Sequence, residues 1–312
     1  MPLLDPSHDF AHPVEGDTAW SESYYFNVYC PVSDTGFYTR IGVRPNEGTI
    51  DAGLSVWVPG GGVVHTHKHR EQREMIDTGL DVDGVRYERI KPLTEWRLTA
   101  DVDRVKVDAT FHALTPAIGV DGQGKQGSGA SAATGASVGK GHLEQAGKWT
   151  GWIEIDGTRH ELVDARGNRD KSWGPRRWGG PKMWRWFSIN IGDDTHFGGI
   201  RIGTDAGDLH RGWAYADGEA ASIREWKVTS ELEPDGVTHN ATHVHATDKL
   251  GRVHELDAEI LRVEPGPAGV RPNTTIVNEG LARWHYEGRT GYGISEYLHQ
   301  LDANAKPVVP IE

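Results

Sequence analysis

The densest polar stretch of the sequence runs from Gly167 to Arg176 and reads Gly-Asn-Arg-Asp-Lys-Ser-Trp-Gly-Pro-Arg. Its one carboxylate, Asp170, stands among cations. Because nearby cations favour the charged form of a carboxylic acid, Asp170 is expected to stay ionised. It could then position water or a substrate hydroxyl, while Arg176 could hold a carbonyl oxygen of the substrate. The alternative is an ion-pair network that clamps two sheets together at the Gly-Pro turn.

Two other acids stand on otherwise apolar faces of expected strands. Glu22 alternates with aromatic and aliphatic residues between Trp20 and Val28. Glu296 has the same setting between Ile294 and Leu298, near the end of the last expected strand. If such a face points inward, the carboxylic acid loses hydration, its pKa rises, and it can donate a proton to an alkene or a carbonyl. Both acids could instead be buried partners of arginines such as Arg40 or Arg283.

The sequence is rich in tryptophan, with 12 residues. Such side chains either fill a core or line a site for a large apolar molecule, and their faces can stabilise positive charge. The residues expected to contact a substrate are Tyr24, Trp173, Trp184, Trp186, Trp213, Trp284 and Tyr297.

Histidines cluster between Gly60 and Glu71, where His65 and His67 would share one face of a strand. The pattern is similar to the first metal motif of cupins, but its glycines stand at other intervals and no second motif follows. A metal-dependent oxygenase that uses His65 and His67 stays an alternative, while no metal or other cofactor is expected. Glycine-rich nucleotide loops and a Gly-x-Ser-x-Gly elbow are missing, which disfavours nucleotide cofactors and serine hydrolysis.

The elements that must position these residues are strands, because apolar and polar residues alternate every two positions through most of the chain. Trp20 to Val28 and Met183 to Ile191 are typical runs, bounded by Gly, Pro, Asn or Asp. His69 to Asp77 is the one stretch that could be a short helix. The pattern predicts an all-β protein built from antiparallel, lipocalin-like barrels or sandwiches.

A length of 312 residues favours two domains. We place the boundary near Asp164, after an expected hairpin that turns at Asp156-Gly157, which divides the chain into residues 1–164 and 165–312. Residues 119–141 form a Gly-, Ser- and Ala-rich tract with too few apolar side chains to fold by itself. A flexible insertion is therefore expected in the first domain.

Charge and composition exclude several classes of partner. The 33 basic and 45 acidic residues give a formal net charge of −12, which disfavours nucleic acid and anionic membrane surfaces. No apolar run is long enough for a membrane span, and the first residues lack the pattern of a secretion signal, so a cytoplasmic protein is expected. Cys30 is the only cysteine, which rules out an intramolecular disulfide. The oligomeric state, a homodimer included, stays open.

The motif from Gly167 to Arg176 resembles the carotenoid 1,2-hydratase and AttH-like superfamily, to which fungal Diels–Alderases are related. The segments His142 to Gln145, Glu22 to Phe26 and Gly36 to Gly42 extend the resemblance over most of the chain. The resemblance implies two consecutive lipocalin-like β domains, a hydrophobic pocket, and cofactor-free chemistry on terpenoid or polyketide-like substrates. The Gly-rich tract departs from the common pattern.

Together these observations predict a cofactor-independent lyase or isomerase, hydratase-like, that uses general acid–base chemistry on a hydrophobic small molecule. Glu22 or Glu296 would donate the proton, Asp170 would activate or position water, and Arg176 would hold a polar end of the substrate. The first alternative is a carrier that binds the same class of ligand without converting it. A carrier needs no acid in its pocket, so it matters whether Glu22 and Asp170 share one cavity.

Overall fold

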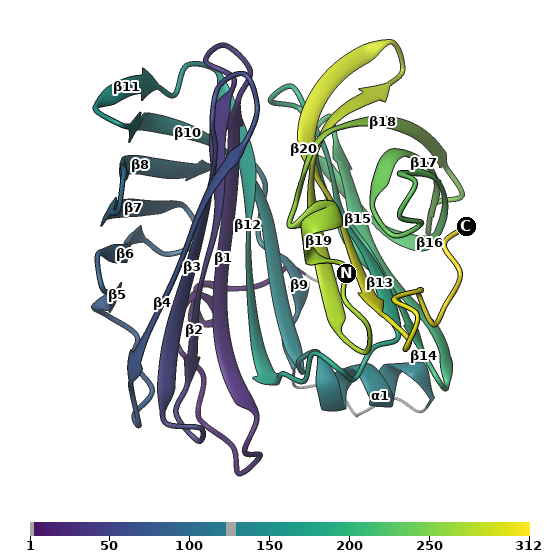
Figure 1. The fold of residues 1–312 in the computed structure, drawn as a ribbon, viewed down its shortest axis with the longest axis horizontal. Coiled ribbons are helices and arrows are strands. Elements are labelled where there is room, and N and C mark those ends of the chain that lie inside the picture. The colour runs from purple at the N-terminus through teal and green to yellow at the C-terminus, as the bar shows by residue number, and fades with distance from the viewer. Residues whose placement is uncertain (1–2, 123–128) are drawn as a thin grey trace. The chain divides into compact units, whose positions relative to one another are not determined.

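The computed structural model describes residues 3–122 and 129–312, which form two compact units. Within the described residues, the first unit comprises residues 3–122 and 139–176, and the second comprises 129–138 and 177–312. Each unit is an antiparallel β-barrel (Figure 1). The all-β class and the two-barrel architecture expected from the alternation are thereby confirmed.

The first unit begins with a short 3-10 helix, η1 (Pro6–Asp9), and continues in strands. These are β1 (Trp20–Cys30), β2 (Thr35–Arg44), β3 (Thr49–Trp57), β4 (Val63–Glu71), β5 (Leu80–Val82), β6 (Val85–Lys91), β7 (Glu95–Val102), β8 (Val105–Ala113), β9 (Ile118–Val120), β10 (Gly141–Ile155), β11 (Thr158–Glu161) and β12 (Ala165–Pro175). The strand order is β4-β3-β2-β1-β12-β10-β8-β7-β6-β5, and β9 and β11 also pair with β10. Because β5 contacts β3 and β4, the sheet is nearly closed.

Aromatic side chains fill the interior of the first unit. Phe26 points inward from β1 and makes edge contacts with Tyr87, Phe111 and Trp149 at ring-centroid distances of 5.2, 6.1 and 6.0 Å. All four side chains are buried. Edge-to-face packing of this kind adds to the stabilisation that burial of the rings provides.

The second unit is a closed barrel in which consecutive strands pair around the ring. The strands are β13 (Met183–Ile191), β14 (Thr195–Thr204), β15 (Gly207–Ala216), β16 (Glu219–Leu232), β17 (His239–Asp248), β18 (Val253–Glu264), β19 (Thr275–Tyr286) and β20 (Arg289–Gln300). Helix α1 (Ala130–Ser137) packs on β14 and β15, and the 3-10 helix η2 (Gly266–Gly269) follows β18. The indole of Trp226 lies across Gly212, where a Cβ atom would stand only 2.5 Å from the ring.

The structure divides the chain later than the sequence pattern predicted. Strand β12 follows Asp164, yet it pairs with both β1 and β10 in the middle of the first sheet. The division between the units therefore lies after Arg176 instead of at Asp164. Residues 165–175 are not among the strands that the alternation predicted, and local alternation carries no information about which strands a segment joins.

Two described parts of the Gly-rich tract form regular structure, which its composition did not predict. Its start belongs to β9, which pairs with β10, and residues 130–137 form α1. Residues 123–128 lie outside the described residues. The stretch His69 to Asp77 is not helical, because β4 continues to Glu71 and irregular chain follows. No helix among the described residues is long and apolar enough to cross a membrane.

Candidate active site

The residues of the central motif lie alternately on the two faces of β12. Arg169, Lys171 and Trp173 stand directly opposite the inward-facing residues of β1, so they face the barrel interior. Asp170 and Ser172 lie on the opposite face of the sheet. We call the groups on these two faces the inner cluster and the outer cluster.

The inner cluster consists of Glu22, Lys171, His12 and Trp173. The ammonium group of Lys171 forms an ion pair with the Glu22 carboxylate and also donates to the Phe10 carbonyl oxygen at 2.9 Å. His12 lies 2.9 Å from the same Glu22 oxygen, and its ring stacks on Trp173 at a centroid distance of 3.8 Å. Burial lowers the pKa of Lys171, while the charge of Glu22 acts against this shift. Glu22 and Lys171 are both fully buried, so this pair has little access to a substrate.

A second buried ion pair extends the inner cluster. Asp9, at the end of η1, accepts from Arg169 at 2.7 Å and from the backbone amide of Leu93 at 2.6 Å. Gln145 accepts from the other side of the Arg169 guanidinium at 2.8 Å. Burial alone would raise the pKa of Asp9, but Arg169, the Leu93 amide and Arg89 together outweigh burial and hold that pKa below its ordinary value. These contacts fasten the segment before β1 to the interior of the barrel.

The arginines that the sequence offered as partners of the lone acids are engaged elsewhere. Arg40 binds Asp51 at 2.8 Å, and Arg283 binds Glu259 at 2.6 Å. The buried partner of Glu22 is Lys171 instead. Lys171 stands in the central motif and reaches Glu22 because β12 is the direct neighbour of β1.

The outer cluster consists of His142, Glu144, Asp170, Ser172 and Arg176. On β10, His142 and Glu144 are two residues apart on one face, and their side chains are 3.0 Å apart at His142 Nε2 and Glu144 Oε1. Across the sheet, Ser172 is opposite His142 and Asp170 is opposite Glu144. Arg176 donates to the Ser172 hydroxyl at 2.8 Å.

The outer cluster combines a titratable imidazole with two carboxylates. Burial by itself would lower the pKa of His142, but the hydrogen bond that His142 donates to Glu144 and the charge of Asp170 outweigh burial and raise this pKa above its ordinary value. Arg176 acts in the opposite direction. The His142 side chain is 29% exposed, whereas that of Glu144 is 4% exposed. A partly exposed imidazole of this kind can serve as a proton donor or acceptor.

The outer cluster contains two residues that the motif alone did not single out as catalytic, His142 and Glu144. Their pattern of His, one residue, then Glu places both side chains on one strand face, which is the feature that could have identified them. What the sequence could not provide is their position beside Asp170, because that depends on the register of β10 against β12. Asp170 and Glu22 lie on opposite faces of the sheet and do not share one cavity in the first unit.

The predicted aromatic residues are divided among several environments. Tyr24 and Trp173 face the interior of the first unit. Trp284 and Tyr297 belong to the core of the second barrel. Four more predicted residues are also buried, but they alternate along the strands with the core residues and so lie on the opposite face of the second barrel's sheet. They are Trp184, Trp186, Trp213 and Glu296.

Glu296 has an aromatic hydrogen-bond partner. The indole Nε1 of Trp184 donates to Glu296 Oε1 at 2.5 Å, and the Glu296 side chain is largely buried. The ring of Trp178 lies 5.7 Å from that of Trp184. Glu296 is therefore held against an indole, as its apolar neighbours in the sequence suggested, and it belongs to a different unit from Glu22.

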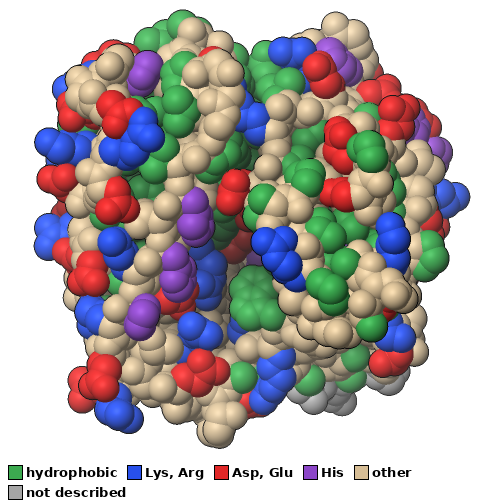
Figure 2. All heavy atoms as spheres, in the orientation of Figure 1, with side chains coloured by type: hydrophobic (Ala, Val, Ile, Leu, Met, Phe, Trp, Pro, Cys, Tyr) green, Lys and Arg blue, Asp and Glu red, His purple; other side chains and the backbone are tan. Residues whose placement is uncertain are grey.

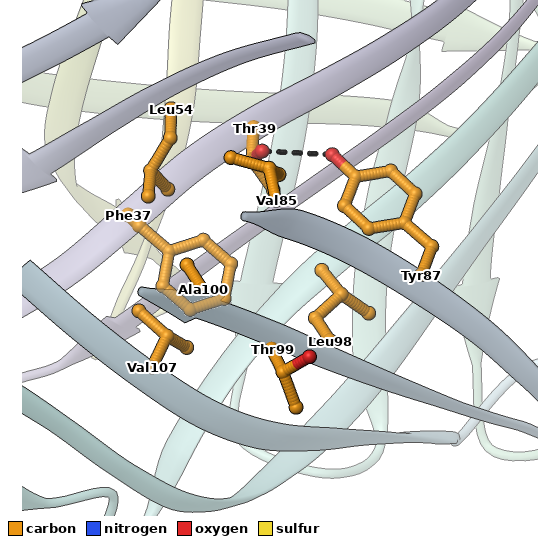
Figure 3. Close-up of a pocket in the computed structure, with 9 residues that line it drawn as sticks. All are labelled: Phe37, Thr39, Leu54, Val85, Tyr87, Leu98, Thr99, Ala100 and Val107. Atoms are coloured by element: carbon orange, nitrogen blue, oxygen red, sulfur yellow. Dashed lines mark hydrogen bonds between the residues drawn. The ribbon is translucent and has the colours of Figure 1, made fainter. Parts of the chain in front are cut away.

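The interior of the first unit contains a small cavity between apolar side chains (Figure 3). Its volume is about 10 Å³, room for about one water molecule and far below the range of about 300–1,000 Å³ that is usual for ligand pockets. Thr39 and Tyr87 share a hydrogen bond of 2.7 Å at its edge. The lining residues are Phe37, Thr39, Leu54, Val85, Tyr87, Leu98, Thr99, Ala100 and Val107. A large apolar substrate does not fit here, because aromatic side chains already fill the space.

The histidines of β4 lie on the surface of the first unit, where Figure 2 shows histidine side chains along one face. His65 hydrogen-bonds to the Ser55 hydroxyl at 2.7 Å, and His67 lies 3.5 Å from Asp51. Among the described residues, no group of three or more His, Cys, Asp or Glu side chains could hold a metal ion. The cupin-like alternative therefore lacks a set of ligands in the part of the chain that the structure describes.

The fold and this site define an all-β protein with two lipocalin-like barrels and an acid–base cluster on one face of the first sheet. Residues 5–301 match a family model described as a domain of unknown function, DUF7064, and the chain belongs to this family. No curated protein matches the sequence.

Solved structures with the same fold confirm the resemblance to the AttH-like two-barrel proteins. A Nitrosomonas europaea protein assigned as AttH has a TM-score of 0.65 and 15% identity, over 96% of this chain and 97% of that one. Kievitone hydratase from Nectria haematococca has a TM-score of 0.62 and 12% identity, over 90% of both chains. CghA has a TM-score of 0.61 and 14% identity, over 92% of this chain and 89% of that one. At these identities the likeness establishes the fold.

Proposed function

We propose that the protein is a cofactor-independent hydro-lyase or isomerase in which the outer cluster supplies the acid and the base. The observation that carries the proposal is the arrangement of His142 beside Glu144, with Asp170 on the neighbouring strand and Arg176 close by. A fold shared with a protein named kievitone hydratase supports the same reaction class.

In this proposal His142 is the proton donor. Its imidazolium form transfers a proton to an alkene carbon or a carbonyl oxygen, and Glu144 orients the ring. In a hydration, water then adds to the resulting cation, and the ionised carboxylate of Asp170 accepts the proton that the water loses. The sum of these steps is the addition of one water molecule, and the reverse sequence is an elimination.

Arg176 gives the site its polar anchor. Its guanidinium holds a carbonyl or hydroxyl of the substrate, in keeping with its position beside Ser172. The expected substrates are hydrophobic small molecules such as terpenoids or polyketides, as the resemblance implies. Glu22 and Glu296 stay alternative donors; each is already hydrogen-bonded to a buried partner, which favours His142.

The compound that co-purifies with the full chain is first identified by mass spectrometry. Its structure then determines a panel of related alkenes and alcohols to be tested as substrates. The panel is incubated in oxygen-labelled water, and incorporation of label is followed. We expect turnover by the wild type and a loss of about 10²-fold or more in His142→Gln and in Asp170→Asn, since general acid–base assistance is worth about 10²–10⁴-fold.

His69→Gln is the matched control, because His69 is an exposed histidine on β4 of the same unit. Wild-type rates in both His142→Gln and Asp170→Asn would contradict the proposal, provided that circular dichroism shows an unchanged fold. Loss of activity in Glu22→Gln together with wild-type activity in His142→Gln would show that Glu22, and not His142, is the proton donor.

One observation favours the alternative of a carrier. Glu22 and Asp170 lie on opposite faces of the sheet, and Glu22 is bound to Lys171, which is the arrangement expected when these acids serve structure. Recovery of the co-purified compound chemically unchanged after prolonged incubation, with the label absent from it, would support the carrier over the enzyme.

A further inference from the structure

Polar side chains gather at one end of the interior of the closed barrel, whose core is otherwise apolar. We call this group, Arg185, His239, Tyr297 and His299, the polar end. The guanidinium of Arg185 lies 4.1 Å from the centre of the Tyr297 ring, and His239 stacks on Tyr297 at 3.8 Å. His239, Tyr297 and His299 are fully buried, and Arg185 is only 4% exposed.

Several polar atoms of the polar end lack the partners that buried groups usually have among the described residues. Arg185 donates to the Trp184 carbonyl oxygen at 2.8 Å, and no described carboxylate lies within ion-pair distance of it. Neither ring nitrogen of His299 has a hydrogen-bond partner, and Nδ1 of His239 has none. A buried guanidinium without an anion and buried ring nitrogens without partners are each costly.

The charge of the polar end is complementary to a ligand with one anionic group. Burial lowers the pKa of His239 to about 3 and that of His299 to about 2, so both rings are neutral at physiological pH. Burial also lowers the pKa of Arg185, to about 10, which leaves the guanidinium charged. The polar end therefore presents one positive charge and the single N–H of the neutral His299 ring. The N–H of His239 is donated to the Ser295 carbonyl oxygen at 2.9 Å, which leaves its Nδ1 as an acceptor.

The chain itself shows that a carboxylate binds next to the polar end. Arg201 is opposite Arg185 on the neighbouring strand. Its Nε donates to Asp208 at 2.8 Å, and its other two nitrogens hold the Glu312 carboxylate through contacts of 2.7 and 3.2 Å. The backbone oxygen of Glu312 accepts from Ser230 at 2.7 Å, and Ile311 packs against the barrel core. Figure 1 shows this segment beside β16. The Ser230 hydroxyl in turn contacts the Tyr297 hydroxyl at 2.7 Å.

We propose that Arg185 and Arg201 form a binding site for a small carboxylate at the polar end of the second barrel, and that Glu312 covers this site. The ligand's carboxylate lies between the two guanidinium groups, and a neighbouring carbonyl or hydroxyl of the ligand accepts the N–H of His299. Glu312 competes for Arg201. The proposal concerns the second unit and does not depend on the acid–base function assigned to the first.

The experiment titrates the full chain with propionate, which resembles the end of the Glu312 side chain, and with neutral propionamide. Binding is followed by calorimetry and by the ring signals of His239 and His299 in NMR spectra. We expect Glu312→Gln to bind propionate about two- to fivefold more tightly than the wild type, since a partly exposed ion pair contributes about 0.2–1 kcal/mol. Propionamide should bind neither protein.

Glu259→Gln is the matched control, because Glu259 forms a similar exposed ion pair with Arg283 in the same unit. Its affinity for propionate should equal that of the wild type. Arg185→Met should abolish binding; where that variant does not fold, Arg201→Gln should weaken binding in the Glu312→Gln background. The proposal is overturned by the absence of saturable propionate binding in Glu312→Gln, by equal binding of propionamide, or by unchanged affinity in a folded Arg185→Met.

Discussion

Consecutive side chains of β12 lie in different environments, because neighbouring residues of a strand point to opposite faces of the sheet. Lys171 is sealed inside with Glu22, whereas Asp170 stands next to His142 and Glu144 on the other face. We predict that Asp170→Asn lowers the pKa of His142, because the charge of Asp170 helps to raise it. NMR titration of the His142 ring measures this shift, and an unchanged pKa would show that the two groups do not interact.

The buried pair of Glu22 and Lys171 gives a second prediction at the residue scale. Glu22→Gln leaves the ammonium group buried without its counter-charge, so we expect a loss of about 3–5 kcal/mol in the free energy of unfolding. Urea unfolding measures the change, with the exposed Glu88→Gln as the control. The double variant Glu22→Leu with Lys171→Met should recover most of the loss; a double variant as unstable as the single one would argue against an electrostatic cause.

At the scale of elements, the segment that contains η1 is fastened to the barrel by Asp9. The paired carboxyl of Asp9 has a lowered pKa, so its stabilisation is complete above the unfolded pKa of about 3.9 and is lost as the pH falls through the folded value. We predict that Asp9→Asn loses about 3–5 kcal/mol at neutral pH, because Arg169 is then buried without an anion.

Urea unfolding between pH 7 and pH 2 checks this prediction for Asp9. The difference between wild type and Asp9→Asn should shrink as the pH falls below the ordinary range of an aspartate. Asp5→Asn is the control in the same segment: Asp5 is exposed and accepts from the Ser7 amide at 2.8 Å. Asparagine caps a helix about as well as aspartate, so this variant should lose little stability. Equal losses in the two variants would contradict the role given to Asp9.

At the scale of the whole molecule, the two barrels differ in how their sheets end. The second barrel is closed, whereas the sheet of the first unit runs from β4 to the three-residue strand β5. Amide hydrogens at such edges open more readily than those between two neighbouring strands. We predict fast hydrogen exchange in β5 and β11 and slow exchange in β1, β10 and β12, measured by mass spectrometry; protection of β5 equal to that of β1 would contradict it.

The sequence by itself determined the class of fold, because alternation between two faces is a local property of each strand. It also identified Asp170 and Arg176 as members of one polar group and placed Glu22 on an apolar face, where the structure confirms its burial. Turn residues and periodicity alone predicted an antiparallel all-β architecture and individual strands such as β13.

Only the tertiary structure decided which side chains meet. Glu22 and Lys171 are 149 positions apart, and Asp9 and Arg169 are 160 apart. The order of strands and their register set these contacts, and neither is written in local alternation. The same reason explains why β12 belongs to the first unit and why His142 and Glu144 stand beside Asp170.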